Sequence, residues 1–130
     1  MTPDVHHIAD LGLDPRGFTG DEYVVGLELE PRHLNIGGIV HGGVLGSLLD
    51  TAMARSYFMA ETGETLSAAT LEMKINFLGS AKSGTLTARA RVVDRTKRTA
   101  YVEGRVERDD GRVIARATAT MMVFTEGAAR

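Results

Sequence analysis

The second half of the chain alternates apolar and polar residues with a period of two, and this pattern constrains the fold most. Such alternation is typical of β-strands with one buried face. Turn-forming residues separate the stretches, and short connections between consecutive strands require antiparallel pairing. Four strands are therefore predicted, over 69–77, 86–92, 100–107 and 113–123.

A glycine-rich run leads into an apolar helix in the middle of the chain. Residues 34–46 hold five of the 15 glycines, and the pattern that follows predicts a helix over 43–60. Its apolar residues cover a wide arc, so the helix should be buried on most sides. The apolar positions of the later strands are mostly alanine. A helix can approach such a surface closely, and we expect it to nest in a curved sheet.

The predicted fold class is α+β, with a curved antiparallel sheet of about five strands around one long central helix. The fifth strand is predicted over 23–30, where apolar and polar residues also alternate. Residues 1–20 carry scattered proline and glycine and are interpreted as an irregular lead-in with at most one helical turn. Residues 1–130 are expected to form a single domain.

Composition excludes several classes of function. A net charge of −2 lacks the basic excess that nucleic-acid binding requires. No apolar run approaches the roughly 20 residues that span a membrane, and the N-terminus has no signal-peptide pattern. The absence of cysteine rules out thiolate chemistry and fits a cytoplasmic location. The four histidines form no metal pattern, so neither a metal nor a cofactor is expected.

Asp50 is the first candidate for chemistry. On a helix it neighbours residues three and four positions away, and three of these four, Gly46, Ser47 and Ala54, are small. A carboxylate with small neighbours at the margin of a buried arc leaves room for a substrate. The alternative, an Asp50 on a solvated stripe, is about equally supported by the pattern alone.

The run His41-Gly42-Gly43 favours the catalytic interpretation of Asp50. Glycines at a helix start let a ligand approach free backbone N–H groups, and the helix dipole favours negative charge there. Alone, the run would be explained by a tight turn. Together with Asp50, a little over two turns later, it combines a carbonyl-polarising group with a base or nucleophile, which suggests acyl transfer.

These residues match a known pattern. The sequence Asn35-x-x-Gly38-x-x-His41-Gly42-Gly43, followed by Leu49-Asp50-x-Ala52, resembles the signature of hotdog-fold thioesterases of the phenylacetate-degradation (PaaI-like) type. The segment 74–84 also resembles the strand and turn after the helix in that family. The resemblance covers roughly residues 23–124. It implies dimers with composite active sites, which often assemble into tetramers, and acyl-CoA as substrate.

The resemblance also implies roles for individual residues. Asp50 would be the nucleophile or general base, and the N–H of Gly42, with Gly43, would polarise the thioester carbonyl. Asn35 would act from the facing subunit and His41 would line the same pocket. Thr70 is the best match for a hydroxyl that assists the acid. Strict alternation, however, places Thr70 on the sheet face away from the helix of its own subunit.

Further residues are expected to contact the substrate. Met53 and Tyr57 would help to set the depth of the acyl pocket, and Lys97 and Arg98 would meet the nucleotide end of CoA. Two other functions remain open. One is a hotdog 3-hydroxyacyl-thioester dehydratase, which the residues match less well, and the other is a non-enzymatic acyl-CoA-binding protein.

Overall fold

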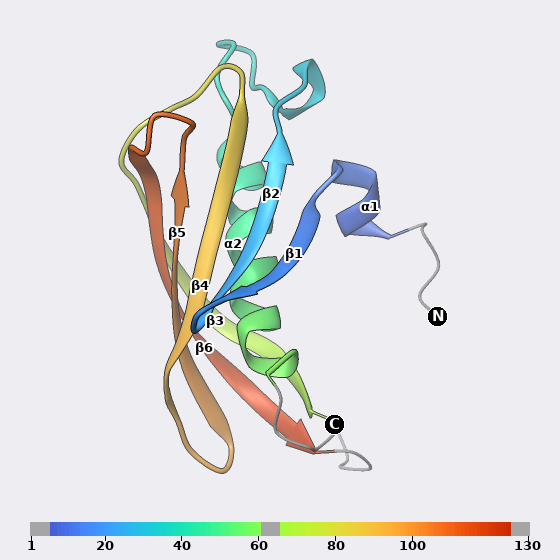
Figure 1. The fold of residues 1–130 in the computed structure, drawn as a ribbon, viewed down its shortest axis with the longest axis vertical. Helices are drawn as coiled ribbons and strands as arrows, with labels where there is room; N and C mark the ends of the chain where they lie inside the picture. Colours follow the sequence, from blue (N-terminus) through green and yellow to red (C-terminus); the bar gives the residue numbers. More distant parts are fainter. Residues whose placement is uncertain (1–5, 61–65, 126–130) are drawn as a thin grey trace.

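The computed structural model describes residues 6–60 and 66–125 (Figure 1). Its described part folds into one six-stranded sheet, one long helix, one short helix and a 3-10 turn. In chain order the elements are α1 (His7–Leu11), β1 (Asp14–Thr19), β2 (Glu22–Glu28), η1 (Pro31–His33), α2 (Gly42–Phe58), β3 (Leu66–Phe77), β4 (Thr85–Arg95), β5 (Thr99–Glu107) and β6 (Val113–Thr125).

The sheet is antiparallel throughout, with the strand order β1-β2-β4-β5-β6-β3. Helix α2 packs against strands β2 to β6, and Figure 1 shows it lying along one face of the curved sheet. This is the hotdog architecture that the resemblance implied. Strand β3 stands at the sheet edge, so one of its sides has no partner strand in the described chain.

The core lies between α2 and the inner face of the sheet. Leu48, Leu49 and Met53 are fully buried on the helix. A methyl group on Gly104 of β5 would lie 3.2 Å from the Met53 Cγ and 3.3 Å from the Leu49 Cδ2. The prediction that small sheet residues let the helix approach closely is therefore confirmed.

The lead-in predicted for 1–20, of which residues 1–5 lie outside the described part, contains the expected helical turn as α1 but is otherwise not irregular. Residues 14–19 form strand β1, which brings the sheet to six strands. Pro15 and Gly17 obscured this strand in the sequence, but at a sheet edge a residue without an N–H breaks no ladder on the open side. The pairing accommodates them through a bulge between Pro15 and Gly17.

The long helix begins at Gly42 and ends at Phe58, whereas the sequence predicted 43–60. The His41 side chain caps its first turn, which fixes the start one residue earlier. None of the described helices is long and apolar enough to cross a membrane.

Candidate active site

Asp50 and Thr70 meet between α2 and β3. Asp50 is half-buried on the helix, and the Thr70 hydroxyl donates a hydrogen bond of 2.7 Å to its Oδ1. A charged acceptor makes such a bond strong and fixes the direction of the carboxylate. The second oxygen, Oδ2, has no hydrogen-bond partner among the described residues. The arrangement therefore holds one oxygen in place and leaves the other for a ligand.

A β-bulge explains why Thr70 reaches the helix, contrary to strict alternation. In the pairing of β3 with β6, Thr70 is opposite Met121 and Glu72 is opposite Thr120, so Leu71 is the extra residue. An extra residue in one strand reverses the sheet face to which the preceding side chains point, compared with strict alternation. Thr70 consequently turns toward α2, while Leu71, predicted to face inward with Met73, is 55% exposed. The prediction that Thr70 faces away from the helix of its own subunit was wrong for this reason.

The start of α2 has one available backbone donor. The His41 Nδ1 accepts the N–H of Gly43 at 2.8 Å, and the His41 carbonyl accepts the N–H of Val44 at 2.9 Å. In the described ranges only Gly42, among the first residues of α2, has an N–H without an acceptor within the chain. The expected pair of glycine donors is thus reduced to Gly42, because His41 occupies the other.

The capping bond also defines the state of the His41 ring. Since Nδ1 accepts a hydrogen bond, the ring proton of the neutral imidazole is on Nε2. A methyl group on Gly43 would lie 3.0 Å from the Nδ1 of His41, so the glycine makes room for the ring. His41 is exposed, and its Nε2–H is directed away from the capping bond, where it can donate to a ligand.

Asn35 shapes the loop that precedes α2. Its Oδ1 accepts the N–H of Gly37 at 2.9 Å and of Ile39 at 3.3 Å. The loop is closed by a bridge between Leu34 and Val40. The side-chain oxygen of Asn35 is therefore used within the loop, and its amide nitrogen is the part that can donate to a substrate.

Two histidines that the sequence did not single out support this region. His33 is fully buried, its Nδ1 accepts the N–H of Glu30 at 2.9 Å, and its Nε2 lies 2.7 Å from the Leu11 carbonyl. Its own carbonyl accepts the N–H of His41 at 2.8 Å. His33 thus connects the N-terminal segment to the loop before α2, a link between distant segments that no local pattern reveals.

The second histidine lies near Asp50. The His7 Nε2 is 2.8 Å from the hydroxyl of Ser47, one helical turn before Asp50. The sequence placed His7 in the irregular lead-in and gave no indication of this contact. The N-terminal segment is fixed by His33 and by a hydrogen bond from Arg32 to the Asp10 carbonyl.

Two residues predicted to line the acyl pocket belong to the core of the single chain. Met53 is fully buried, and Tyr57 is 5% exposed. The guanidinium of Arg95 lies over the Tyr57 ring, 5.2 Å from its centre. Neither side chain lines any of the three hollows found among the described residues.

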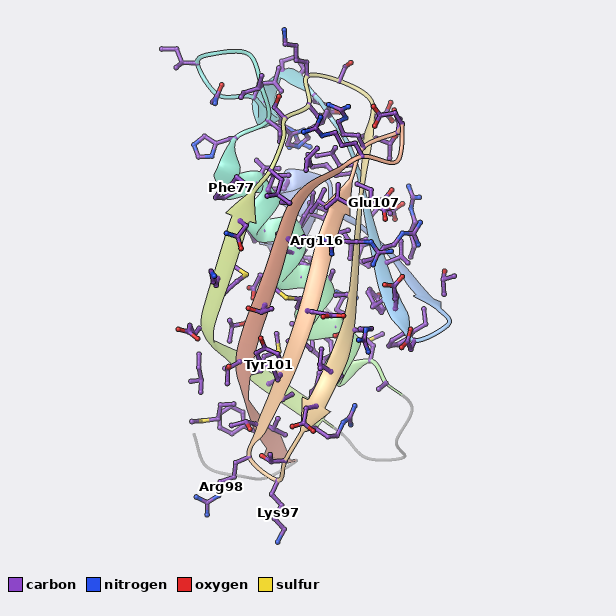
Figure 2. The ribbon with its side chains drawn as sticks, turned by 90° about the vertical axis from the view of Figure 1, so that its left-hand side faces the viewer. Phe77, Lys97, Arg98, Tyr101, Glu107 and Arg116 are labelled. Atoms are coloured by element: carbon purple, nitrogen blue, oxygen red, sulfur yellow. The ribbon has the colours of Figure 1, made fainter. Side chains whose placement is uncertain are left out.

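Lys97 and Arg98 are exposed in the turn between β4 and β5, at one tip of the molecule (Figure 2). Thr70 pairs with Met121, which pairs in turn with Ala100 at the start of β5. This register places the basic turn at the same end of the sheet as the contact between Asp50 and Thr70.

The distance between Gly42 and Asp50 limits what one chain can do. They are eight residues apart on α2, which corresponds to about 12 Å along the helix axis. A base and an oxyanion donor must each lie within about 3 Å of the groups they act on, so the two cannot serve one carbonyl within a single chain. Three hollows that the described residues line include neither Gly42 nor Asp50.

The described residues contain no group of three or more His, Asp or Glu side chains that could hold a metal ion.

Comparison with known proteins identifies the family. Residues 37–115 match the family described as the Thioesterase superfamily, a range that includes most of the candidate site. A protein of Saccharolobus solfataricus, named as a candidate esterase, is 36% identical over 91 residues, which are 70% of this chain and 59% of that protein. The chain thus spans less than two thirds of the length of that relative.

Solved structures agree with this match. A candidate thioesterase of Ralstonia eutropha, described as a phenylacetic acid degradation-related protein, is 32% identical, with a TM-score of 0.79 over 94% of this chain and 91% of that one. A thioesterase of Haemophilus influenzae has a TM-score of 0.86 over 95% of this chain and 85% of that one. At 20% identity the second likeness supports the fold alone.

Proposed function

The chain belongs to the thioesterase superfamily, and from this membership we propose that it hydrolyses an acyl- or aryl-CoA thioester to the free acid and CoA. The observation that carries the proposal is the Asp50 carboxylate, held by Thr70 with one oxygen available to a ligand. The substrate is taken to be a CoA ester because two basic side chains, Lys97 and Arg98, are exposed at the same end of the sheet.

In the proposed reaction Asp50 acts on water or on the carbonyl itself. As a general base it removes a proton from water, whose oxygen then bonds to the thioester carbon. The carbonyl oxygen becomes an oxyanion that the Gly42 N–H stabilises, with Asn35 and His41 as further donors. When the oxyanion re-forms the carbonyl, the carbon–sulfur bond breaks and the CoA thiolate leaves, taking up the proton that Asp50 removed. As a nucleophile, Asp50 would instead bond to the carbonyl carbon and displace the CoA thiolate. Water would then hydrolyse the resulting anhydride to the free acid and regenerate Asp50.

A second copy of the chain would complete the site. Because Gly42 and Asp50 are too far apart on one helix, the Gly42 that serves a given Asp50 would come from a partner. A two-fold axis beside β3 would bring each helix start toward the other helix centre, producing two identical composite sites.

The surface around β3 supports such pairing. Along this side of α2 the small residues Gly42 and Gly46 lie against Phe77 and Ile75 of β3. Strand β3 has an unpaired side, and its exposed apolar residues include Leu71 and Phe77. Exposed apolar side chains at an open strand edge favour association. We propose a homodimer, from which a tetramer can be built, and one domain that spans residues 1–130.

The two ends of the proposed substrate, the nucleotide and the acyl group, would occupy different parts of the site. The phosphates of CoA would contact Lys97 and Arg98, and the acyl group would enter between the paired subunits, toward Met53 and Tyr57. CoA esters and a chain without cysteine are both consistent with the cytoplasm, which we propose as its location.

The test is thiol release from short, long and aryl acyl-CoAs by the wild type and by Asp50→Asn. Loss of a catalytic base costs at least about 100-fold, so turnover should fall by this factor while folding and CoA-ester binding remain. Asp94→Asn, an exposed carboxylate on β4, is the matched control and should keep wild-type turnover. Full activity of Asp50→Asn, or enoyl product without thiol from a 3-hydroxyacyl-CoA, would contradict the proposal.

A further inference from the structure

Three arginines stand side by side on the outer face of the sheet, away from α2. Arg89 of β4 pairs directly with Arg105 of β5, and Arg105 pairs with Arg116 of β6. Directly opposed residues have Cβ atoms about 5 Å apart, and like charges in such positions are destabilising. An arrangement that opposes strand pairing indicates a functional use for the charges.

Acidic residues neutralise two of these arginines. Arg105 binds Glu22 at 2.6 Å and Glu107 at 2.8 Å, and Arg89 binds Glu107 at 3.2 Å. Arg116 is different, since it has no acidic partner among the described residues. Lys74 of β3, the strand next to β6, has no acidic partner among them either. The sheet therefore presents two cations without counter-charges next to a satisfied ion-pair network.

These side chains border a hollow of about 380 Å³. Five basic side chains line it, and three of them are ion-paired, since Arg91 also binds Glu103 at 2.8 Å. The cationic excess of the hollow therefore comes from Arg116 and Lys74. The polar side chains of Asn76 and Thr118 also line the hollow. Two copies packed face to face here would bring like charges together, so a second copy is disfavoured and an anionic ligand is favoured.

The same hollow has an aromatic side chain at its other end. Tyr101 of β5 lines it and is 44% exposed. Tyr101 and Arg105 are four residues apart on one strand face, which corresponds to about 13 Å. Figure 2 shows Tyr101 and Arg116 on this face, with Tyr101 nearer the turn that carries Lys97 and Arg98. Cationic side chains at one end and a flat ring at the other match the phosphates and the base of a nucleotide.

We propose that this hollow is a nucleotide-binding site, separate from the thioesterase site. The phosphates bind Arg116 and Lys74, where the guanidinium can hold two phosphate oxygens at once. The base stacks on Tyr101, a contact that tolerates any base because every base has a π-face. The ligand is either a free nucleotide or the nucleotide portion of a CoA molecule, which share this chemistry.

The test measures binding of ADP, pyrophosphate and adenosine by titration calorimetry on the full chain. We expect ADP to bind more tightly than either fragment. Arg116→Gln should weaken ADP and pyrophosphate at least about 10-fold, the size of a lost charge-assisted contact. Tyr101→Leu should weaken ADP about 5- to 100-fold and leave pyrophosphate unchanged. Arg112→Gln, an exposed arginine outside the hollow, is the charge-matched control and should bind as the wild type does.

Competition identifies the source of the ligand. Displacement of ADP by CoA assigns the site to the nucleotide portion of CoA, and failure to displace it assigns the site to a free nucleotide. Thioester turnover of Arg116→Gln should remain at the wild-type level, so failure of this proposal is distinguishable from failure of the proposed reaction. No ADP binding at millimolar concentration, or binding that both hollow variants leave unchanged, would overturn the proposal.

Discussion

Thr70 shows how much one side chain can contribute to the site. Its hydroxyl fixes Asp50, so its loss should release the carboxylate without removing it. We expect Thr70→Ala to lower kcat about 10-fold with little change in KM, since general-base catalysis depends on geometry. Thr70→Ser keeps the hydroxyl and should restore most of the activity. Steady-state kinetics on one acyl-CoA gives both constants, and equal loss in the two variants would contradict this role.

At the same scale, local pattern singled out Asp50, His41 and Gly42 as candidates but could not indicate what surrounds them. A glycine run before a buried helix is visible in any sequence, because helix starts have characteristic residues. The hydrogen bonds of His33 to Leu11 and of His7 to Ser47 join segments 22 and 40 residues apart. No periodicity contains such information, so these two histidines could only be found in the folded chain.

Among the elements, the strands of regular composition were predictable, and the irregular ones were not. Strands β4, β5 and β6 keep their alternation over most of their length, and their positions agree with the prediction to within a few residues. Strand β1 carries Pro15 and Gly17, which usually indicate a loop. Strand β3 keeps the expected composition, but its bulge cannot be read from residue types. The facing of Thr70 therefore required the structure.

The ion pairs that join β4 and β5 should make stability depend on pH. Burial raises the pKa of Glu107, but hydrogen bonds from Arg105 and Arg89 lower it by more, so the net shift is downward from 4.5. A carboxylate with a lowered pKa stabilises the fold fully above the pKa of its unfolded form, and this stabilisation is lost as pH falls through the folded value.

The free energy of unfolding should therefore fall below about pH 4.5 by more in the wild type than in Glu107→Gln. Urea denaturation at a series of pH values measures the difference between the two proteins. If the free energy of unfolding fell with pH equally in both proteins, the hydrogen bonds to Glu107 would contribute nothing to stability.

At the scale of the whole molecule, a mixing experiment tests whether the site is shared between two copies. Gly42→Pro removes the N–H proposed to polarise the carbonyl, and proline is well tolerated at the first position of a helix. His41, with φ −67° and ψ 135°, already has the conformation that a residue before proline prefers. Both Gly42→Pro and Asp50→Asn should be nearly inactive alone.

Co-refolding of equal amounts of the two variants should restore about a quarter of wild-type turnover. Half of the dimers are then mixed, and one of the two sites in each mixed dimer has both groups intact. Thiol release by the mixture, compared with each variant alone, measures the recovery. If one chain supplied both groups, the mixture would stay as inactive as its components.

The bulge at Leu71 has a consequence for how such a chain can change over evolutionary time. Deleting one residue there would leave the ladder between β3 and β6 pairable, because the ladder already passes over the extra residue. Thr70 would then directly precede Glu72, so it would still lie opposite Met121 and still face Asp50. Substitutions at Leu71 that keep the bulge should likewise be neutral for the contact between Thr70 and Asp50. A change that straightened the bulge with every residue kept would instead place Leu71 opposite Met121 and turn Thr70 outward. In this strand, the pairing register is under stronger constraint than the identity of the bulged residue.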